Sequence, residues 1–87
     1  MLYRIYTEDR ENLPSLANAY FAGYSLYKGV GYWRGQEEKS AVIEVVTDDS
    51  KEEANAVECL ARSIRLTNHQ ESVLVISLPC QSKFIND

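Results

Sequence analysis

The chain has 87 residues, of which 45% are hydrophobic and 25% charged, and its formal net charge is −4 at pH 7. This length and composition predict a single globular domain over residues 1–87 and exclude a disordered chain. The acidic balance argues against a nucleic-acid polymer as partner, because phosphate binding needs a clustered basic face. No apolar run approaches the roughly 20 residues that span a membrane, and residues 1–6 are too short and polar for a signal peptide. Cys59 and Cys80 lack metal-ligand spacing, so we expect a cytoplasmic protein with free thiols, no metal and no cofactor.

The first half of the chain predicts a strand, a helix and a hairpin. Residues 2–7 are rich in tyrosine and isoleucine, which is typical of a strand. A helix follows, since Pro14 suits a first helical turn and Gly23 suits the position just after a helix end. One face of that helix is apolar at helical spacing, and it carries Leu13, Leu16, Ala17 and Tyr20. Strands over 24–34 and 41–47, with a turn at Gly35, predict the hairpin.

The second half predicts a longer helix and a last strand. Ser50 and Glu53 have the spacing of a capping box, in which each side chain satisfies the other's backbone N–H. The buried stripe of the helix consists of Val57, Leu60, Ala61 and Ile64. The strand over 73–78 stops at Pro79, and Phe84 and Ile85 indicate a short edge strand in the tail. On the helix's outer face, Cys59 and Leu66 are either a subunit contact or scattered surface residues.

The order strand, helix, strand, strand, helix, strand predicts an α+β protein with the ferredoxin-like βαββαβ fold. Its four-stranded antiparallel sheet would carry both helices on one face. A sheet with an open face should alternate polar and apolar residues, yet 41–46 and 73–76 are nearly continuous apolar runs. Both faces therefore need cover, and the second cover must come from the tail or from another subunit. We expect a homo-oligomer, either a trimer or a dimer.

In this topology three loops meet at one end of the sheet: the loop after the first strand, the hairpin tip and the loop before the last strand. We expect the ligand-binding residues there, and they are Trp33, Arg34, Gln36, Glu38, Asn68, Gln70 and Glu71. Trp33 would stack on a flat ring, Arg34 would pair with an anion, and the amides would recognise hydrogen-bonding groups. The alternative is a solvated loop end with loose salt bridges.

Four other positions in the sequence carry predictions. Gly29 and Gly31 interrupt a strand, which indicates close approach of another backbone or a bulky ring, because no helix follows to make a phosphate loop. Glu44 interrupts an apolar strand, so we expect it to pair with Arg4 on the neighbouring strand; a catalytic carboxylate is the alternative. His69 has no metal-ligand or triad partner at fixed spacing, and we expect it on a loop surface.

Two motifs resemble a group of small uncharacterised bacterial and phage proteins. Residues 31–36 match their G-Y-W-[KR]-G-Q hairpin, and residues 68–75 match their late N-x-Q-E-x-V-L-V segment. The resemblance covers residues 20–75 and implies no particular activity. More loosely, the element order is similar to that of the PII and CutA proteins, which are trimers of ferredoxin-like subunits. The PII likeness implies a nucleotide-like ligand held between subunits.

Three classes of function follow from these observations. The first is a non-enzymatic homo-oligomer that binds a small polar or anionic ligand, sensing or sequestering a nucleotide-like signal. The second is a protein-interaction module, such as a phage-encoded inhibitor of a host protein. The third is a small enzyme with Glu38, Glu71 or His69 as acid or base, although no residue spacing requires one.

Overall fold

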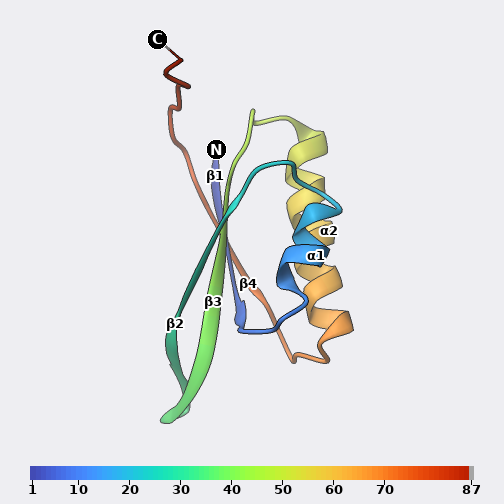
Figure 1. Ribbon diagram of the computed structural model, residues 1–87, viewed down its shortest axis with the longest axis vertical. Coiled ribbons are helices and arrows are strands. Elements are labelled where there is room, and N and C mark those ends of the chain that lie inside the picture. The colour runs from blue at the N-terminus through green and yellow to red at the C-terminus, as the bar shows by residue number, and fades with distance from the viewer. Residues whose placement is uncertain (87) are drawn as a thin grey trace.

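The computed structural model describes residues 1–86. Its elements in chain order are β1 (Leu2–Glu8), α1 (Leu13–Asn18), β2 (Ser25–Trp33), β3 (Gln36–Val46), α2 (Lys51–Thr67) and β4 (Leu74–Leu78). The four strands form one antiparallel sheet in the order β2-β3-β1-β4. Both helices lie on the same side of this sheet (Figure 1). The predicted α+β class, with a four-stranded antiparallel sheet and two helices, is confirmed.

The hydrophobic core lies between the helices and one face of the sheet. Successive residues of a strand point to opposite faces, so every second residue of β1 and β3 enters this layer, including Ile5, Ile43 and Val45. The predicted stripe of α2 is buried there: Val57, Leu60, Ala61 and Ile64. Tyr20, which the pattern placed on the buried face of the first helix, is instead exposed, and its hydroxyl lies 3.1 Å from the Ser63 hydroxyl.

The first helix is shorter than predicted. It ends at Asn18 with Ala19 as its C-cap, so the prediction that Gly23 closes it is wrong. The Tyr24 hydroxyl donates to Asn18 Oδ1 at 2.8 Å and to the Pro14 carbonyl at 3.3 Å. These contacts hold the segment that leads into β2 against the short helix. Tertiary packing thus overrides the local helical pattern.

The hairpin of β2 and β3 is the most extended part of the molecule. β3 begins at Gln36, five residues before the prediction, because the turn contains only Arg34 and Gly35. Both turn residues have positive φ, 52° and 77°, as a type I′ turn requires. β1 pairs with β3 only as far as Ser40, so residues 30–39 form a two-stranded ribbon beyond the rest of the sheet. We call residues 30–39 the hairpin arm; it projects away from the helices (Figure 1).

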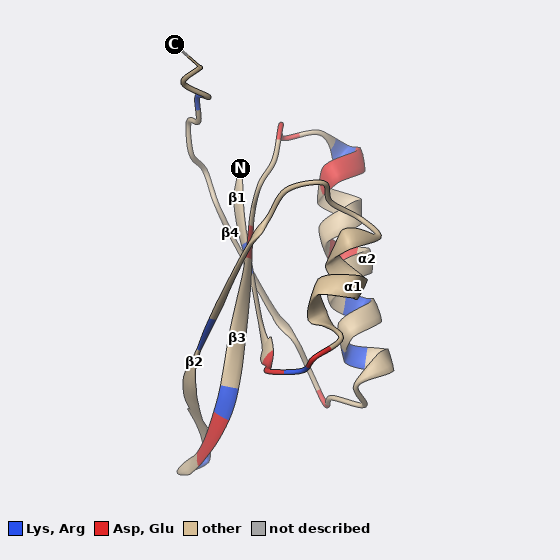
Figure 2. Ribbon diagram, viewed as in Figure 1, with Lys and Arg blue, Asp and Glu red and all other residues tan. Residues whose placement is uncertain are grey.

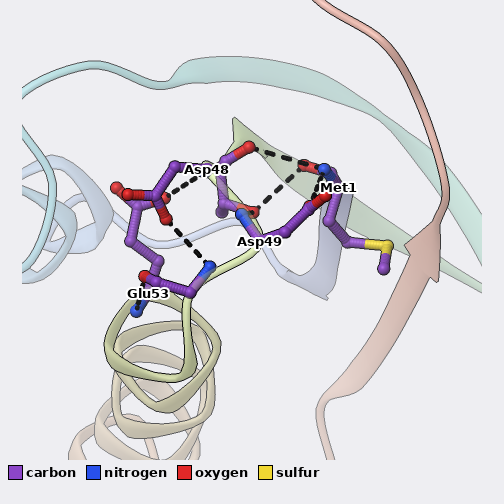
Figure 3. Close-up of polar contacts among 6 residues, drawn as sticks. Met1, Asp48, Asp49 and Glu53 are labelled. Carbon is purple, nitrogen blue, oxygen red and sulfur yellow. Dashed lines mark hydrogen bonds and ion pairs between the residues drawn. The ribbon is translucent and has the colours of Figure 1, made fainter.

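The start of α2 is fixed by a network around its cap (Figure 3). Ser50 Oγ accepts the Glu53 N–H at 3.1 Å, which is the first half of the predicted capping box. The second half is wrong: the Glu53 carboxylate accepts the Asp48 N–H at 2.9 Å, and Asp48 Oδ1 accepts the Ser50 N–H at 2.9 Å. The bonds from Ser50 lower the pKa of Asp48. The Met1 ammonium pairs with Asp49, whose hydrogen bond raises the pKa of that ammonium.

The tail does not cover the sheet. Residues 79–86 contain no strand, and both Phe84 and Ile85 are exposed, so the predicted edge strand is wrong. Cys59 and Cys80 are free and exposed. Neither helix within residues 1–86 is long and apolar enough to cross a membrane.

Candidate functional site

The face of the sheet opposite the helices has an orderly arrangement of side chains. Arg4 lies opposite Glu44 in the β1–β3 register, and Arg4 Nε donates to Glu44 Oε2 at 2.9 Å, which confirms the predicted pair. The hydrogen bond that Arg4 donates to Glu44 raises the pKa of Arg4. Two residues further along the strands, on the same face, apolar and aromatic residues from all four strands lie side by side in one row. This row consists of Tyr27, Val42, Tyr6 and Leu74.

Next to this row the sheet face is hollowed. The hollow has a volume of about 680 Å³ and lies between the hairpin arm, β1 and the loop before β4. Its aromatic lining includes Tyr6, Tyr27 and Trp33, and its floor includes Gly29, Gly31 and Ser40. We call it the sheet hollow.

The two glycines leave the floor of the sheet hollow without side chains. Gly29 lies opposite Ser40 and Gly31 opposite Glu38, on the same face of β2 as Tyr27 and Trp33. A Cβ at Gly31 would meet Ser40 at 3.6 Å, an ordinary contact, and one at Gly29 would lie 4.0 Å from the Ser40 hydroxyl. The chain therefore has room for side chains at both positions and carries none.

The hairpin tip brings Trp33 and Arg34 together. Neighbouring residues of a regular strand point to opposite faces, but Arg34 occupies the turn with positive φ. Its guanidinium lies over the Trp33 ring, 5.4 Å from the ring centroid, in a cation–π contact. The tip is thus a stacked aromatic and cationic unit at the end of an exposed arm.

Two of the predicted amides hold the fold together. Gln70 is buried; its Nε2 donates to Thr7 Oγ1 at 2.7 Å, and its Oε1 accepts the Glu8 N–H at 3.3 Å. Asn68 exchanges hydrogen bonds with Asn12, at 2.7 and 3.1 Å. These bonds tie the loop before β4 to β1 and to the start of α1. Sequence reasoning found the two amides but missed Thr7 and Asn12, because their sequence separation gave no signal for the pairing.

The structure brings together part of the predicted site. Four of the predicted residues line the sheet hollow, namely Trp33, Glu38, Gln70 and Glu71. Arg34 lies at its edge over Trp33, while Gln36 and Asn68 are outside the lining. Sequence reasoning missed the aromatic wall of Tyr6 and Tyr27. The alternation of Tyr27, Gly29, Gly31 and Trp33 along one strand face was the signal that could have found it.

Known proteins offer a fold for comparison. No family model and no curated protein matches the chain. The de novo designed protein Foldit4 is similar in structure, with a TM-score of 0.51 at 16% identity over 92% of this chain and 94% of that one. At this identity the similarity concerns the fold alone.

Charge is unevenly distributed around the sheet hollow. The acidic residues of its lining are Glu8, Glu38 and Glu71, and its basic residue is Lys28. Glu8 pairs with Arg10, and Lys28 Nζ lies 3.8 Å from Asp9 Oδ2. The charged residues of the arm and of the two neighbouring loops gather at the same end of the sheet (Figure 2). Within residues 1–86 no three His, Cys, Asp or Glu residues are grouped closely enough to hold a metal ion.

Proposed function

We propose that this protein is a non-enzymatic homo-oligomer that binds a small polar ligand in the sheet hollow, at a boundary between subunits. The observation that carries the proposal is the hollow of about 680 Å³ on an uncovered apolar sheet face. Small-molecule sites occupy about 300–1,000 Å³ and combine aromatic walls with a few polar groups. The same face needs cover, and a second copy that covers it would enclose the ligand.

The chemistry of the lining favours a ligand with a flat ring. Tyr27 and Trp33 offer ring faces at either end of the glycine floor, and Ser40 and Glu38 offer hydrogen-bonding oxygens beside it. A nucleotide-like signal fits this proposal if its base lies on the aromatic wall and its anionic part faces Arg34 and Lys28. Ligand sensing or sequestration in the cytoplasm is the role we propose.

The fold proposed for this role is the ferredoxin-like one. Its support is the βαββαβ element order, together with two helices on one side of the sheet. A ring of three copies is the proposed assembly by analogy with PII and CutA proteins, and the analogy rests on architecture. The second candidate is a protein-interaction module such as a phage-encoded inhibitor, and the exposed hairpin arm favours it.

Native mass spectrometry of freshly purified protein tests the proposal. We expect an oligomer that retains a small molecule, and we expect Trp33→Leu to lose that added mass because it removes the indole ring from the lining of the hollow. Phe84→Leu is the matched control, since Phe84 is also exposed but lies in the tail. A bare monomer contradicts the proposal, and a retained host protein in place of a small molecule favours the interaction module.

A further inference from the structure

We propose that the hairpin tip of one copy enters the sheet hollow of a second copy, where the tip's Arg34 pairs with Glu71 of the receiving copy. This inference rests on the proposed function for the assembly, and it names the contact that closes the site. The hollow is then lined by two subunits, with the incoming tip as its roof and the ligand beneath it.

The first observation is that the hairpin arm lacks support within its own chain. Tyr32 and Trp33 are 73% and 58% exposed, and Val30 beside them is exposed as well. A two-stranded ribbon is marginally stable in water unless further strands or other protein surface cover it. The arm nevertheless carries large apolar side chains at its end, which is typical of a segment that packs against another molecule.

The second observation is charge complementarity between the tip and the hollow. Arg34 stacks on Trp33, is exposed, and forms no ion pair with any of residues 1–86. Glu71 is exposed on the loop before β4, lines the hollow and likewise has no ion-pair partner among the described residues. The opposite charges of Arg34 and Glu71 attract each other across a contact between copies, which sets the register of that contact.

The third observation is the glycine floor. Gly29 and Gly31 present bare backbone within the hollow, and the space above them is free of side chains from β2. Bare backbone lets a flat ring approach closely, which leaves room for a ligand between the floor and the incoming tip. This explains why a strand with room for side chains keeps two glycines on the face that bears Tyr27 and Trp33.

Charge reversal in separate chains tests the contact. Arg34→Glu and Glu71→Arg each place like charges together between identical copies, so we expect each to weaken self-association by about tenfold or more. Mixing the two variants pairs opposite charges between unlike copies, so we expect the mixture to form complexes that contain both variants, although a ring of three keeps one contact between like charges. Assembly is measured by light scattering and by the emission of Trp33, the protein's single tryptophan, which shifts to the blue when the tip is buried.

Controls and second variants keep the result interpretable. Arg62→Glu and Glu58→Arg make the same charge changes on exposed positions of α2 and should leave the assembled mass unchanged. If a reversal variant unfolds in thermal melts, Arg34→Gln and Glu71→Gln replace it and should weaken association in the same direction.

Three results would overturn the inference. One is wild-type association in both reversal variants, and another is a mixture of the two variants in which no complex contains both. If the wild type is an oligomer that carries a ligand and both reversal variants assemble in the same way, the tip contact is refuted and the proposed function stands. A monomeric wild type without ligand would refute both.

Discussion

At the scale of single residues, the polar end of the sheet separates into groups that hold the fold and groups that face the hollow. The side-chain amides of Gln70 and Asn68 form hydrogen bonds with Thr7, Glu8 and Asn12. Glu71, the next residue after Gln70, is exposed. Buried side-chain polar groups in residues 1–86 are all hydrogen-bonded. A loop amide is therefore weak evidence for ligand binding until its burial is known.

Gln70 tests this assignment. Gln70→Ala leaves Thr7 Oγ1 and the Glu8 N–H without their partner, and we expect it to lower the free energy of unfolding by about 1–3 kcal/mol. Urea denaturation followed by circular dichroism measures the change. Gln36→Ala, at an exposed position in the same end of the molecule, should stay within about 0.5 kcal/mol of wild type. Equal effects of the two substitutions would contradict a structural role for Gln70.

Asp48 gives the start of α2 a pH dependence with a defined sign. Its hydrogen bonds from Ser50 lower its pKa in the folded state below the ordinary value of 3.8. The stabilisation is thus fully present above about pH 4, and it is lost as the pH falls through the folded-state pKa. We expect Asp48→Ala to melt at a lower temperature than wild type at pH 7, and the gap to close in strong acid. Thermal melts from pH 7 to pH 2 measure it, and a gap independent of pH would show that the carboxylate charge is immaterial.

At the scale of elements, the hairpin arm shows where sequence patterns succeed and where they stop. The buried stripe of α2 and the pair of Arg4 with Glu44 followed from periodicity and from the cost of an unpaired charge. The early start of β3 did not, because residues 36–40 are polar and the strand forms there through pairing with β2 across a two-residue turn. The short α1 and the free tail also depend on tertiary packing, which no local pattern records.

The glycine floor of β2 yields a prediction at this scale. A methyl group at position 31 meets Ser40 at an ordinary 3.6 Å, so Gly31→Ala should leave unfolding within about 1 kcal/mol of wild type, in the stabilising direction. The same methyl group enters the sheet hollow and should weaken ligand retention and self-association.

Gly23→Ala is the matched control for Gly31→Ala. It adds a methyl group with nothing within 4 Å, in the loop between α1 and β2, and should leave both properties unchanged. Thermal melts and native mass spectrometry provide the two readouts. Full retention of ligand and assembly by Gly31→Ala would show that the bare floor has no binding role, and unfolding of the variant would contradict the room for a methyl group at this position.

At the scale of the whole molecule, the sheet has one covered and one uncovered side. The helices bury the face that bears Ile5 and Ile43, while the opposite face exposes Tyr27 and Leu74 beside the ion pair of Arg4 and Glu44. The continuous apolar runs of β3 and β4 indicated this two-sided character from sequence alone. Topology likewise placed part of the candidate site, since three loops meet at one end, but the hollow itself became visible only in three dimensions.

The uncovered face and the outer face of α2 are the two surfaces on which copies could meet, and two leucines distinguish them. Leu74 on the uncovered face and Leu66 on α2 are 58% and 57% exposed, so a lysine at either position has nearly the same cost to the isolated fold. If copies associate through the uncovered face, Leu74→Lys places a charge inside the interface and should shift the assembly to monomer. Leu66→Lys should then keep the wild-type mass. Light scattering across a dilution series measures both, with thermal melts to show that each variant is folded. Dissociation by Leu66→Lys alone would move the interface to α2, and it would leave the sheet hollow open to solvent in the assembled protein.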